Sequence, residues 1–274
     1  MPDNKYLSNE GLLSLAIQAA MDAAIPILEI YRQEFTVEMK ADNSPLTLAD
    51  KASHHTIMER LASSGIPVLS EEGRAMPYEE RKDWEYLWIV DPLDGTKEFI
   101  KKNDEFTVNI ALVRNGKPEL GVIYVPVLKE LYFAAPEFGS WKVISIQAEI
   151  KTIDIHALIQ SGKRLPVAQS ARPFTIVASR SHLNQETQSY IDEILQKFPD
   201  AVMISRGSSL KLCQIAEGAA DIYPRFAPTM EWDTAAGQAI ITHSGGFVNN
   251  MESGEEMTYN KENLLNPWFI AGRK

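Results

Sequence analysis

A strongly apolar run that ends in a tight acidic turn restricts the fold of this chain more than any other feature. Residues 86–90, YLWIV, indicate a strand, and the next residues, DPLDG, place Asp91 and Asp94 three positions apart around a proline. The ends of neighbouring strands are where side chains converge in layered α/β folds. Either these two charges face water as ordinary turn residues, or a cation lies between them.

The composition limits the class of protein. The 274 residues can bury one large core or two small ones, and a formal net charge of −10 argues against binding to nucleic acids or acidic membranes. The single cysteine, Cys213, excludes an intrachain disulfide and a thiolate metal cluster, and it fits a reducing compartment. We see no signal peptide and no apolar run of about 18 residues, and we therefore expect no membrane span.

Hydrophobic periodicity predicts a layered α/β (α+β) fold, because strands alternate with helices that can cover their sheets. In the first half it predicts helices at 8–32 and 48–64 and strands at 66–70 and 85–90. It also predicts a polar loop at 39–47 and a meander from 106 that turns at Asn115-Gly116. In the second half it predicts strands at 174–179, 201–205 and 220–224, helices at 185–197, 208–218 and 233–244, and a last apolar run at 268–271. Residues 145–173 are weakly patterned, so we expect a linker or an insertion there, at the boundary between an N-terminal α+β half (1–145) and a C-terminal α/β half (146–274).

Acidic residues recur at the predicted ends of strands and starts of helices. Glu71 follows the strand at 66–70, Asp91 and Asp94 follow the next strand, and Asp233 begins a helix. If these strand ends and helix starts converge, the four carboxylates come close together, and they then repel one another unless cations lie between them. Mg²⁺ prefers oxygen ligands, and the short turn would direct the Leu93 carbonyl into the same space. Two such ions about 4 Å apart form a clamp for in-line phosphoryl displacement.

Two glycine-containing segments are candidate anion sites. A helical turn that begins at Gly95-Thr96 would point free N–H groups at a phosphate, and Gly95 would let the phosphate approach closely. The segment GSSLK, 207–211, starts a predicted helix and carries Lys211 one turn in, and Arg225 is a further candidate.

Each feature taken alone has an ordinary structural interpretation. Asp91 and Asp94 suit a turn, Glu71 suits a solvated loop, and Asp233 suits a helix N-cap. GSSLK is an ordinary helix start, and Cys213 is interpreted as a core thiol. Only the joint pattern favours a metal-dependent phosphatase that acts on a polyanionic small molecule.

Three motifs together carry a resemblance to a known family. DPLDGT (91–96), preceded by SEEG (70–73) and followed by WDTAAG (232–237), resembles the Mg²⁺-dependent, Li⁺-sensitive phosphatase superfamily that includes inositol monophosphatase. The likeness covers about residues 8–274, is weakest at 145–173, and implies an αβαβα sandwich. After DGT the chain has Lys97-Glu98, which is similar to the 3'(2'),5'-bisphosphate nucleotidases, where inositol monophosphatases usually have Thr-Asn.

The resemblance implies roles for individual residues. One Mg²⁺ would be bound by Glu71, Asp91 and the Leu93 carbonyl, and a second by Asp91, Asp94 and Asp233, with two or three ions in all. Thr96 would donate towards Asp50 while it accepts from the nucleophilic water, and Glu71 would complete the catalytic set. The residues implied to contact the scissile phosphate are Glu71, Leu93, Asp94, Gly95, Thr96 and Asp233. Those implied to hold a second phosphate are Ser209, Lys211 and Arg225, with residues 179–182 near the nucleotide.

The implied activity is hydrolysis of the 3'-phosphate of 3'-phosphoadenosine 5'-phosphate to AMP and phosphate, and of the 5'-phosphosulfate analogue, by in-line attack of metal-activated water. This would place the enzyme in sulfur metabolism, in the cytoplasm, at most peripheral on the cytoplasmic face of the inner membrane. The alternative is an inositol or sugar monophosphatase of the same superfamily, and a non-catalytic Mg²⁺-binding protein is a third hypothesis. The oligomeric state stays open.

Overall fold

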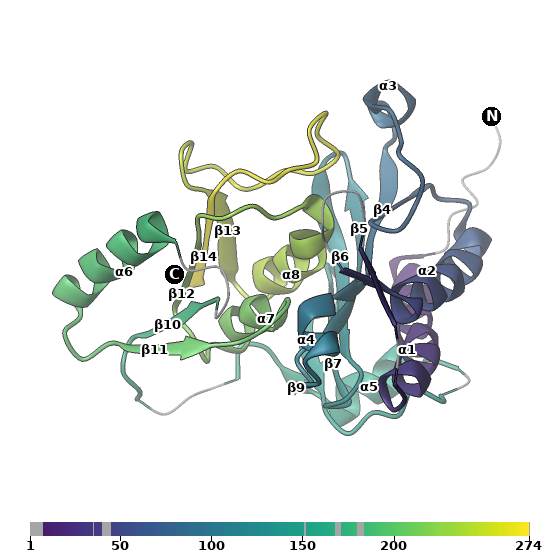
Figure 1. The fold of residues 1–274 in the computed structure, drawn as a ribbon, viewed down its shortest axis with the longest axis horizontal. Helices are drawn as coiled ribbons and strands as arrows, with labels where there is room; N and C mark the ends of the chain where they lie inside the picture. Colours follow the sequence, from purple (N-terminus) through teal and green to yellow (C-terminus); the bar gives the residue numbers. More distant parts are fainter. Residues whose placement is uncertain are drawn as a thin grey trace.

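The computed structural model describes residues 8–34, 36–39, 45–150, 152–167, 171–179 and 184–273. These residues stack in five layers, in which helices α1 and α2, a seven-stranded sheet, helices α7 and α8, a five-stranded sheet and helix α6 follow one another from right to left in Figure 1. The predicted layered α/β fold is therefore confirmed.

The seven-stranded sheet follows chain order. Only β3 and β4 pair in parallel, and every later neighbour is antiparallel. Asn115 and Gly116 both have positive φ and form the predicted hairpin turn between β5 and β6. Its strands are β3 (Val68–Ser70), β4 (Tyr86–Asp94), β5 (Thr107–Arg114), β6 (Lys117–Val125), β7 (Glu130–Ala135), β8 (Gly139–Val143) and β9 (Lys163–Arg164).

The five-stranded sheet has the order β11-β10-β12-β14-β13, with parallel pairing around β10 and antiparallel pairing around β14. Its strands are β10 (Thr175–Ala178), β11 (Val202–Ser205), β12 (Ile222–Arg225), β13 (Gly246–Asn250) and β14 (Phe269–Arg273). The remaining helices of this half are α6 (Gln185–Lys197), α7 (Leu210–Glu217) and α8 (Glu231–His243). The sequence pattern predicted the three helices but not β13.

Helix α8 lies between the two sheets and contacts both. It lies unusually close to β6, because a Cβ placed on Gly121 would come within 2.4 Å of the carbonyl oxygen of Ala236. On its other side, Gly237 leaves room for Leu212 of α7. Glycine at these two positions therefore lets α8 pack close to β6 and to α7. One of the predicted site residues, Asp233, lies at the start of α8.

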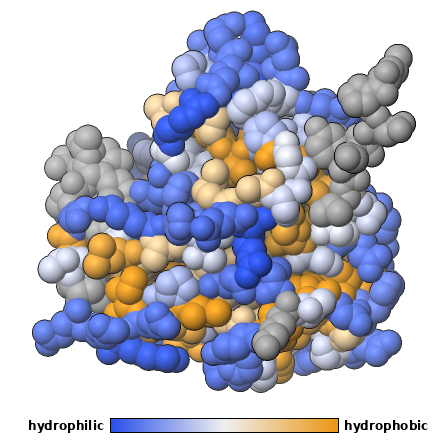
Figure 2. Space-filling view, turned by 90° about the vertical axis from the view of Figure 1, so that its right-hand side faces the viewer, coloured by the Kyte–Doolittle hydropathy of each residue, from blue (hydrophilic) through white to orange (hydrophobic). Residues whose placement is uncertain are grey.

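Helix α1 (Asn9–Tyr31) covers the outer face of the first sheet together with α2 (Leu48–Leu61), which ends in a short 3₁₀ turn, Ala62–Ser64. Ser8 caps α1 as predicted, and Gly65, with φ of 67°, ends the second helix as predicted. By length and composition alone α1 could cross a membrane, but more than half of its most apolar window is buried in the core. On this side of the molecule, hydrophobic and hydrophilic residues are interspersed (Figure 2).

One prediction about a connecting segment was wrong. The segment 39–47, predicted as a loop, contributes to a small antiparallel pair, β1 (Val37–Met39) with β2 (Pro45–Thr47), and residues 40–44 lie outside the described residues. The segment 145–173, predicted as a linker or an insertion, contains α5 (Ile155–Ser161) and β9, and β9 pairs with β8 of the first sheet. The last strand of the first sheet ends at Arg164 and the first strand of the second sheet begins at Thr175, and the division into halves at 145/146 stays a prediction. A seven-residue helix and a two-residue strand are too short to show a clear period.

Candidate active site

The acidic motif continues β4 rather than following it. Asp91 pairs with Asn109 and Asp94 with Thr107, with an irregularity between them that bends the strand end. The N–H of Leu93 donates to Asp91 Oδ1 at 3.0 Å. Gly95 then adopts a φ of 91° and leads into α4 (Thr96–Ile100), so the predicted helical turn at Gly95-Thr96 is present.

A cavity of about 290 Å³ brings most of the predicted residues together. It opens where the end of β4 meets the starts of α4, α7 and α8 and the end of β12. Ser179 also lines it, whereas residues 180–182 lie outside the described residues. The predicted residues on its wall are Glu71, Asp91, Leu93, Asp94, Gly95, Thr96, Ser209, Lys211, Arg225 and Asp233.

The carboxylates in this cavity act on one another. Burial, and then repulsion by Glu71, Asp94 and Asp233, raises the pKa of Asp91 well above its ordinary value. Removal from bulk water, and then repulsion by Asp94, raises the pKa of Asp233 to about 8, although the Met230 N–H donates to it at 2.8 Å and opposes the rise. The charged forms of Asp91 and Asp233 are therefore disfavoured by burial and by the neighbouring carboxylates.

The side chains do not converge on one point. Within the described ranges, no three Asp, Glu, His or Cys side chains lie close enough to hold a metal ion. Asp94 Oδ2 instead accepts hydrogen bonds from Ser208 at 2.7 Å and Ser209 at 2.6 Å. The donor chemistry nevertheless fits a hard divalent cation, because oxygen ligands that repel one another at ordinary pH are stabilised by positive charge.

Asp50 lies behind the cavity wall, close to Thr96. The Thr96 hydroxyl donates to Asp50 Oδ1 at 3.2 Å, while Asp50 Oδ2 accepts from the Thr47 N–H at 2.7 Å and the Thr47 hydroxyl at 2.6 Å. Asp50 is thereby part of the capping box of α2, which the sequence analysis did not predict. Burial raises the pKa of Asp50, and the donors on Thr47 and Thr96 oppose the rise. The two residues predicted to act together are thus in contact.

Two positive side chains, Lys211 and Arg225, also line the cavity. Burial lowers the pKa of Lys211 to about 8, and its ammonium donates to the carbonyls of Ser208 at 2.6 Å and Arg206 at 3.3 Å. Arg225 is 8% exposed and donates through Nη2 to the Pro228 carbonyl at 3.1 Å. Its buried Nε has no hydrogen-bond partner among the described residues. A buried guanidinium donor left without a partner in a cavity wall is suited to an anionic ligand.

Comparison with known proteins identifies the family. Residues 8–268 match the inositol monophosphatase family. The chain belongs to this family. It is 44% identical to the 3'(2'),5'-bisphosphate nucleotidase CysQ of Shigella flexneri over 94% of this chain and 98% of that protein, and 43% identical to the protein of the same name in Escherichia coli K12, over the same shares.

Solved structures agree with this assignment. The structure of CysQ from Bacteroides thetaiotaomicron, described as a bacterial member of the inositol monophosphatase family, is 51% identical, with a TM-score of 0.90 over 97% of this chain and 98% of that chain. The extragenic suppressor protein suhB of Bartonella henselae is 26% identical, with a TM-score of 0.72 over 96% and 94% of the two chains.

In this family member, further polar residues hold the acidic motif in place, and sequence reasoning did not single them out. The Asn109 amide donates to Ser209 Oγ at 2.9 Å, and Thr107 Oγ1 lies 2.8 Å from Ser208 Oγ. The Ser209 hydroxyl, predicted to bind a second phosphate, is therefore engaged with the acidic motif. The available signal was that Thr107 and Asn109 are polar residues spaced two apart in an otherwise apolar strand, and so lie on one face of β5.

Proposed function

We propose that this protein is a divalent-cation-dependent 3'(2'),5'-bisphosphate nucleotidase that releases the 3'-phosphate of 3'-phosphoadenosine 5'-phosphate, and of its 5'-phosphosulfate analogue. One observation carries the proposal: a single cavity is lined both by carboxylates and by the buried cations Lys211 and Arg225, and we propose that these residues form a carboxylate end and a cationic end. A ligand with two phosphates can occupy both ends at once, whereas a monophosphate ester needs only one. The names of the relatives above support the same substrate class.

The carboxylate end would handle the phosphate that is removed. Two Mg²⁺ ions held by Glu71, Asp91, the Leu93 carbonyl, Asp94 and Asp233 would supply charge neutralisation and Lewis acidity there. The backbone at Gly95 would lie close to the same phosphate. Gly95 has a positive φ of 91°, and a Cβ placed on it would lie only 3.2 Å from Ser208 Cβ, which explains why a larger residue does not fit at this position.

Asp50 and Thr96 would orient the attacking water. The Thr96 hydroxyl has one proton, which Asp50 Oδ1 at 3.2 Å or the Leu93 carbonyl at 3.4 Å can accept, and we propose that Asp50 accepts it. The lone pairs of the hydroxyl are then directed to accept from a water molecule at the cavity wall. This would hold the water in position for in-line attack on the phosphorus atom. As the water gives up a proton to the Thr96 hydroxyl, that hydroxyl would pass its own proton to the Asp50 carboxylate.

The cationic end would bind the second phosphate. Arg225 would use its unpartnered Nε, and Lys211 would add its charge from the start of α7. We also propose a cytoplasmic location, since the single thiol, Cys213, is buried and unpaired. Nothing in α1 supports peripheral membrane contact, because its 23 residues include no lysine or arginine.

The experiment is phosphate release from 3'-phosphoadenosine 5'-phosphate and from inositol 1-phosphate, each with Mg²⁺ and with EDTA. We expect Mg²⁺-dependent preference for the nucleotide. Arg225→Met should raise KM for the nucleotide by about 10- to 100-fold, the value of one or two charge-assisted hydrogen bonds, and change KM for the inositol ester little. Equal effects of Arg225→Met on both substrates, or a preference for inositol 1-phosphate, would favour the alternative, an inositol or sugar monophosphatase.

A further inference from the structure

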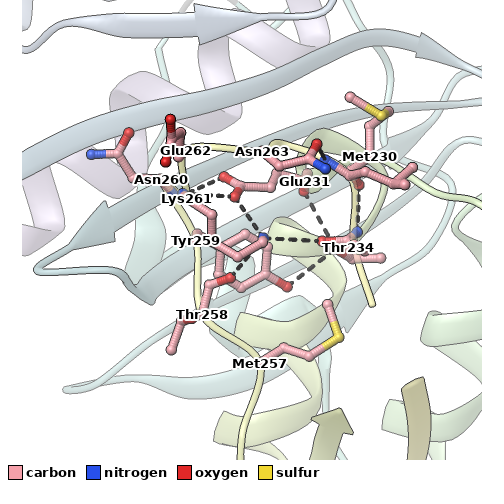
Figure 3. A network of polar contacts seen from close by, with 12 residues as sticks. Met230, Glu231, Thr234, Met257, Thr258, Tyr259, Asn260, Lys261, Glu262 and Asn263 are labelled. Carbon is pink, nitrogen blue, oxygen red and sulfur yellow. Dashed lines mark hydrogen bonds and ion pairs between the residues drawn. The ribbon is translucent and has the colours of Figure 1, made fainter. Parts of the chain in front are cut away.

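A fully buried carboxylate lies two residues before Asp233, outside the cavity. Glu231 is 0% exposed, and Oε2 accepts from the Asn260 N–H at 2.6 Å. Its Oε1 accepts from the N–H of Lys261 at 3.0 Å and from the Lys261 ammonium at 2.6 Å. Figure 3 shows this carboxylate directed at the chain around Asn260 and Lys261. The first turn of α8 is thereby attached to the loop 257–266.

Other contacts of this loop also hold the start of α8. The Asn266 amide donates to the Met230 carbonyl at 2.6 Å and to Thr234 Oγ1 at 3.0 Å, and the Tyr259 hydroxyl donates to Thr234 Oγ1 at 3.2 Å. Thr234 and Tyr259 both appear beside Glu231 in Figure 3. Because Asp233 belongs to the same helical turn and accepts from the Met230 N–H, the loop determines where the Asp233 carboxylate lies.

Asn260 connects this loop to the other half of the site. Its Oδ1 accepts from Arg81 Nη1 at 2.7 Å, and its Nδ2 donates to the Arg81 carbonyl at 2.7 Å. Arg81 is 1% exposed, and its Nη2 also donates to the Glu262 carbonyl at 3.1 Å. Arg81 ends α3 (Tyr78–Arg81), on the segment that begins with Glu71 at the end of β3. The Asn260 side chain therefore contacts Arg81, on the segment that begins with Glu71. Its backbone N–H contacts Glu231, in the helical turn that contains Asp233.

We propose that Arg81, Asn260 and Glu231 form a positioning relay that sets the spacing between Glu71 and Asp233. These two carboxylates come from opposite halves of the cavity, and they already repel each other across it. Without a rigid connection the repulsion would separate them, and a cation would have to draw them together at a cost in affinity. The inference rests on the cation site proposed above.

A polar relay suits this task because each buried group has few alternative partners. Moving one element relative to the other would leave the guanidinium of Arg81 or the carboxylate of Glu231 buried without its hydrogen bonds. Apolar contacts slide more readily, since they lack direction. Groups that support metal ligands in this way typically change metal affinity by about 10- to 100-fold when they are altered.

The test measures Mg²⁺ binding to the substrate-free protein by isothermal titration calorimetry. Asn260→Gly is the main variant: Asn260 has a φ of 62°, which glycine adopts without strain, so the change removes the link to Arg81 and keeps the backbone. Arg81→Met is a second variant, and Asn260→Asp, which keeps an acceptor for Arg81, is the conservative one. Arg172→Met is the matched control, because Arg172 also makes two hydrogen bonds to a partner, Asp221, at 2.6 and 2.9 Å, but does not line the cavity.

We expect Asn260→Gly to weaken Mg²⁺ binding by about tenfold or more, with a smaller loss in Asn260→Asp and none in Arg172→Met at similar thermal stability. Turnover of Asn260→Gly should recover at high Mg²⁺ concentration. Equal Mg²⁺ affinity in the wild type and Asn260→Gly, or an equal loss in Arg172→Met, would overturn the relay and leave the proposed function standing. A wild-type protein that binds no Mg²⁺ would overturn the cation site and the relay together.

Discussion

Thr96 offers the sharpest test of the proposed activation of water. Thr96→Val keeps the size and branching of the side chain and removes only the hydroxyl that donates to Asp50 Oδ1 at 3.2 Å. Asp50 is 2% exposed, so its Oδ1 is left without that donor. A lost hydrogen bond to a buried carboxylate costs about 1 to 3 kcal/mol of folding free energy, which is about 2 to 5 °C in Tm for a domain of this size.

The expected effect on catalysis is larger than the effect on stability. Loss of a group that positions the water and its proton lowers kcat by about 10²- to 10⁴-fold, or about 3 to 5 kcal/mol in the barrier. Because the Thr96 donor opposes the raised pKa of Asp50, its removal should also move the acidic limb of the pH–rate profile to higher pH. Mg²⁺ affinity should stay near the wild-type value, since Thr96 supplies no proposed cation ligand.

The assay is steady-state phosphate release from 3'-phosphoadenosine 5'-phosphate across pH, together with calorimetric Mg²⁺ titration and thermal unfolding. Thr96→Ser, which restores the hydroxyl, should recover most of kcat. Thr56→Val is the matched control, because the Thr56 hydroxyl only donates to the Ala52 carbonyl within α2, at 3.0 Å. A kcat for Thr96→Val within about threefold of the wild type would refute the proposed role of Thr96, since even a weak positioning effect exceeds this.

Three further predictions concern charge, packing and ion selectivity. In EDTA, thermal stability should fall as pH rises from about 4 to about 8, because the pKa of Asp233 is raised from 3.8 to about 8 and its charged form is disfavoured in the folded protein. A Mg²⁺-saturated sample should show a smaller change of Tm with pH. The same dependence of Tm on pH in both samples would contradict the argument from repulsion. Gly121→Ala should destabilise the protein by about 1 to 3 kcal/mol or more in urea unfolding, since the new Cβ would meet the Ala236 carbonyl oxygen at 2.4 Å; an unchanged midpoint would show that α8 can move away from β6. Li⁺ at roughly 10 mM or above should inhibit phosphate release, because all-oxygen cation sites admit small hard ions; a rate insensitive to Li⁺ would count against such a site.

The sequence predicted long, periodic elements well. The helix at 185–197 has the predicted bounds, and the hairpin turn at Asn115-Gly116 is where its residue types placed it. It predicted short elements poorly: β13 and α5 were missed, because elements of five and seven residues show too little periodicity. The turn expected after Val90 is part of β4, because pairing with β5 continues through the irregular strand end to Asp94.

For the candidate site, the sequence alone determined which types of residue are available to it. The acidic residues, the glycine before α4 and the cationic residues were identified by type and position, and most of them line one cavity. Only the tertiary structure decided their partners. It placed the Ser209 hydroxyl on Asp94 and made Asp50 a helix cap as well as the partner of Thr96. It also joined Arg81 to Asn260, residues that are 179 positions apart. The reason is physical: residue type sets what a group can donate, accept or ionise, whereas pairing depends on distances between distant segments that local patterns do not encode.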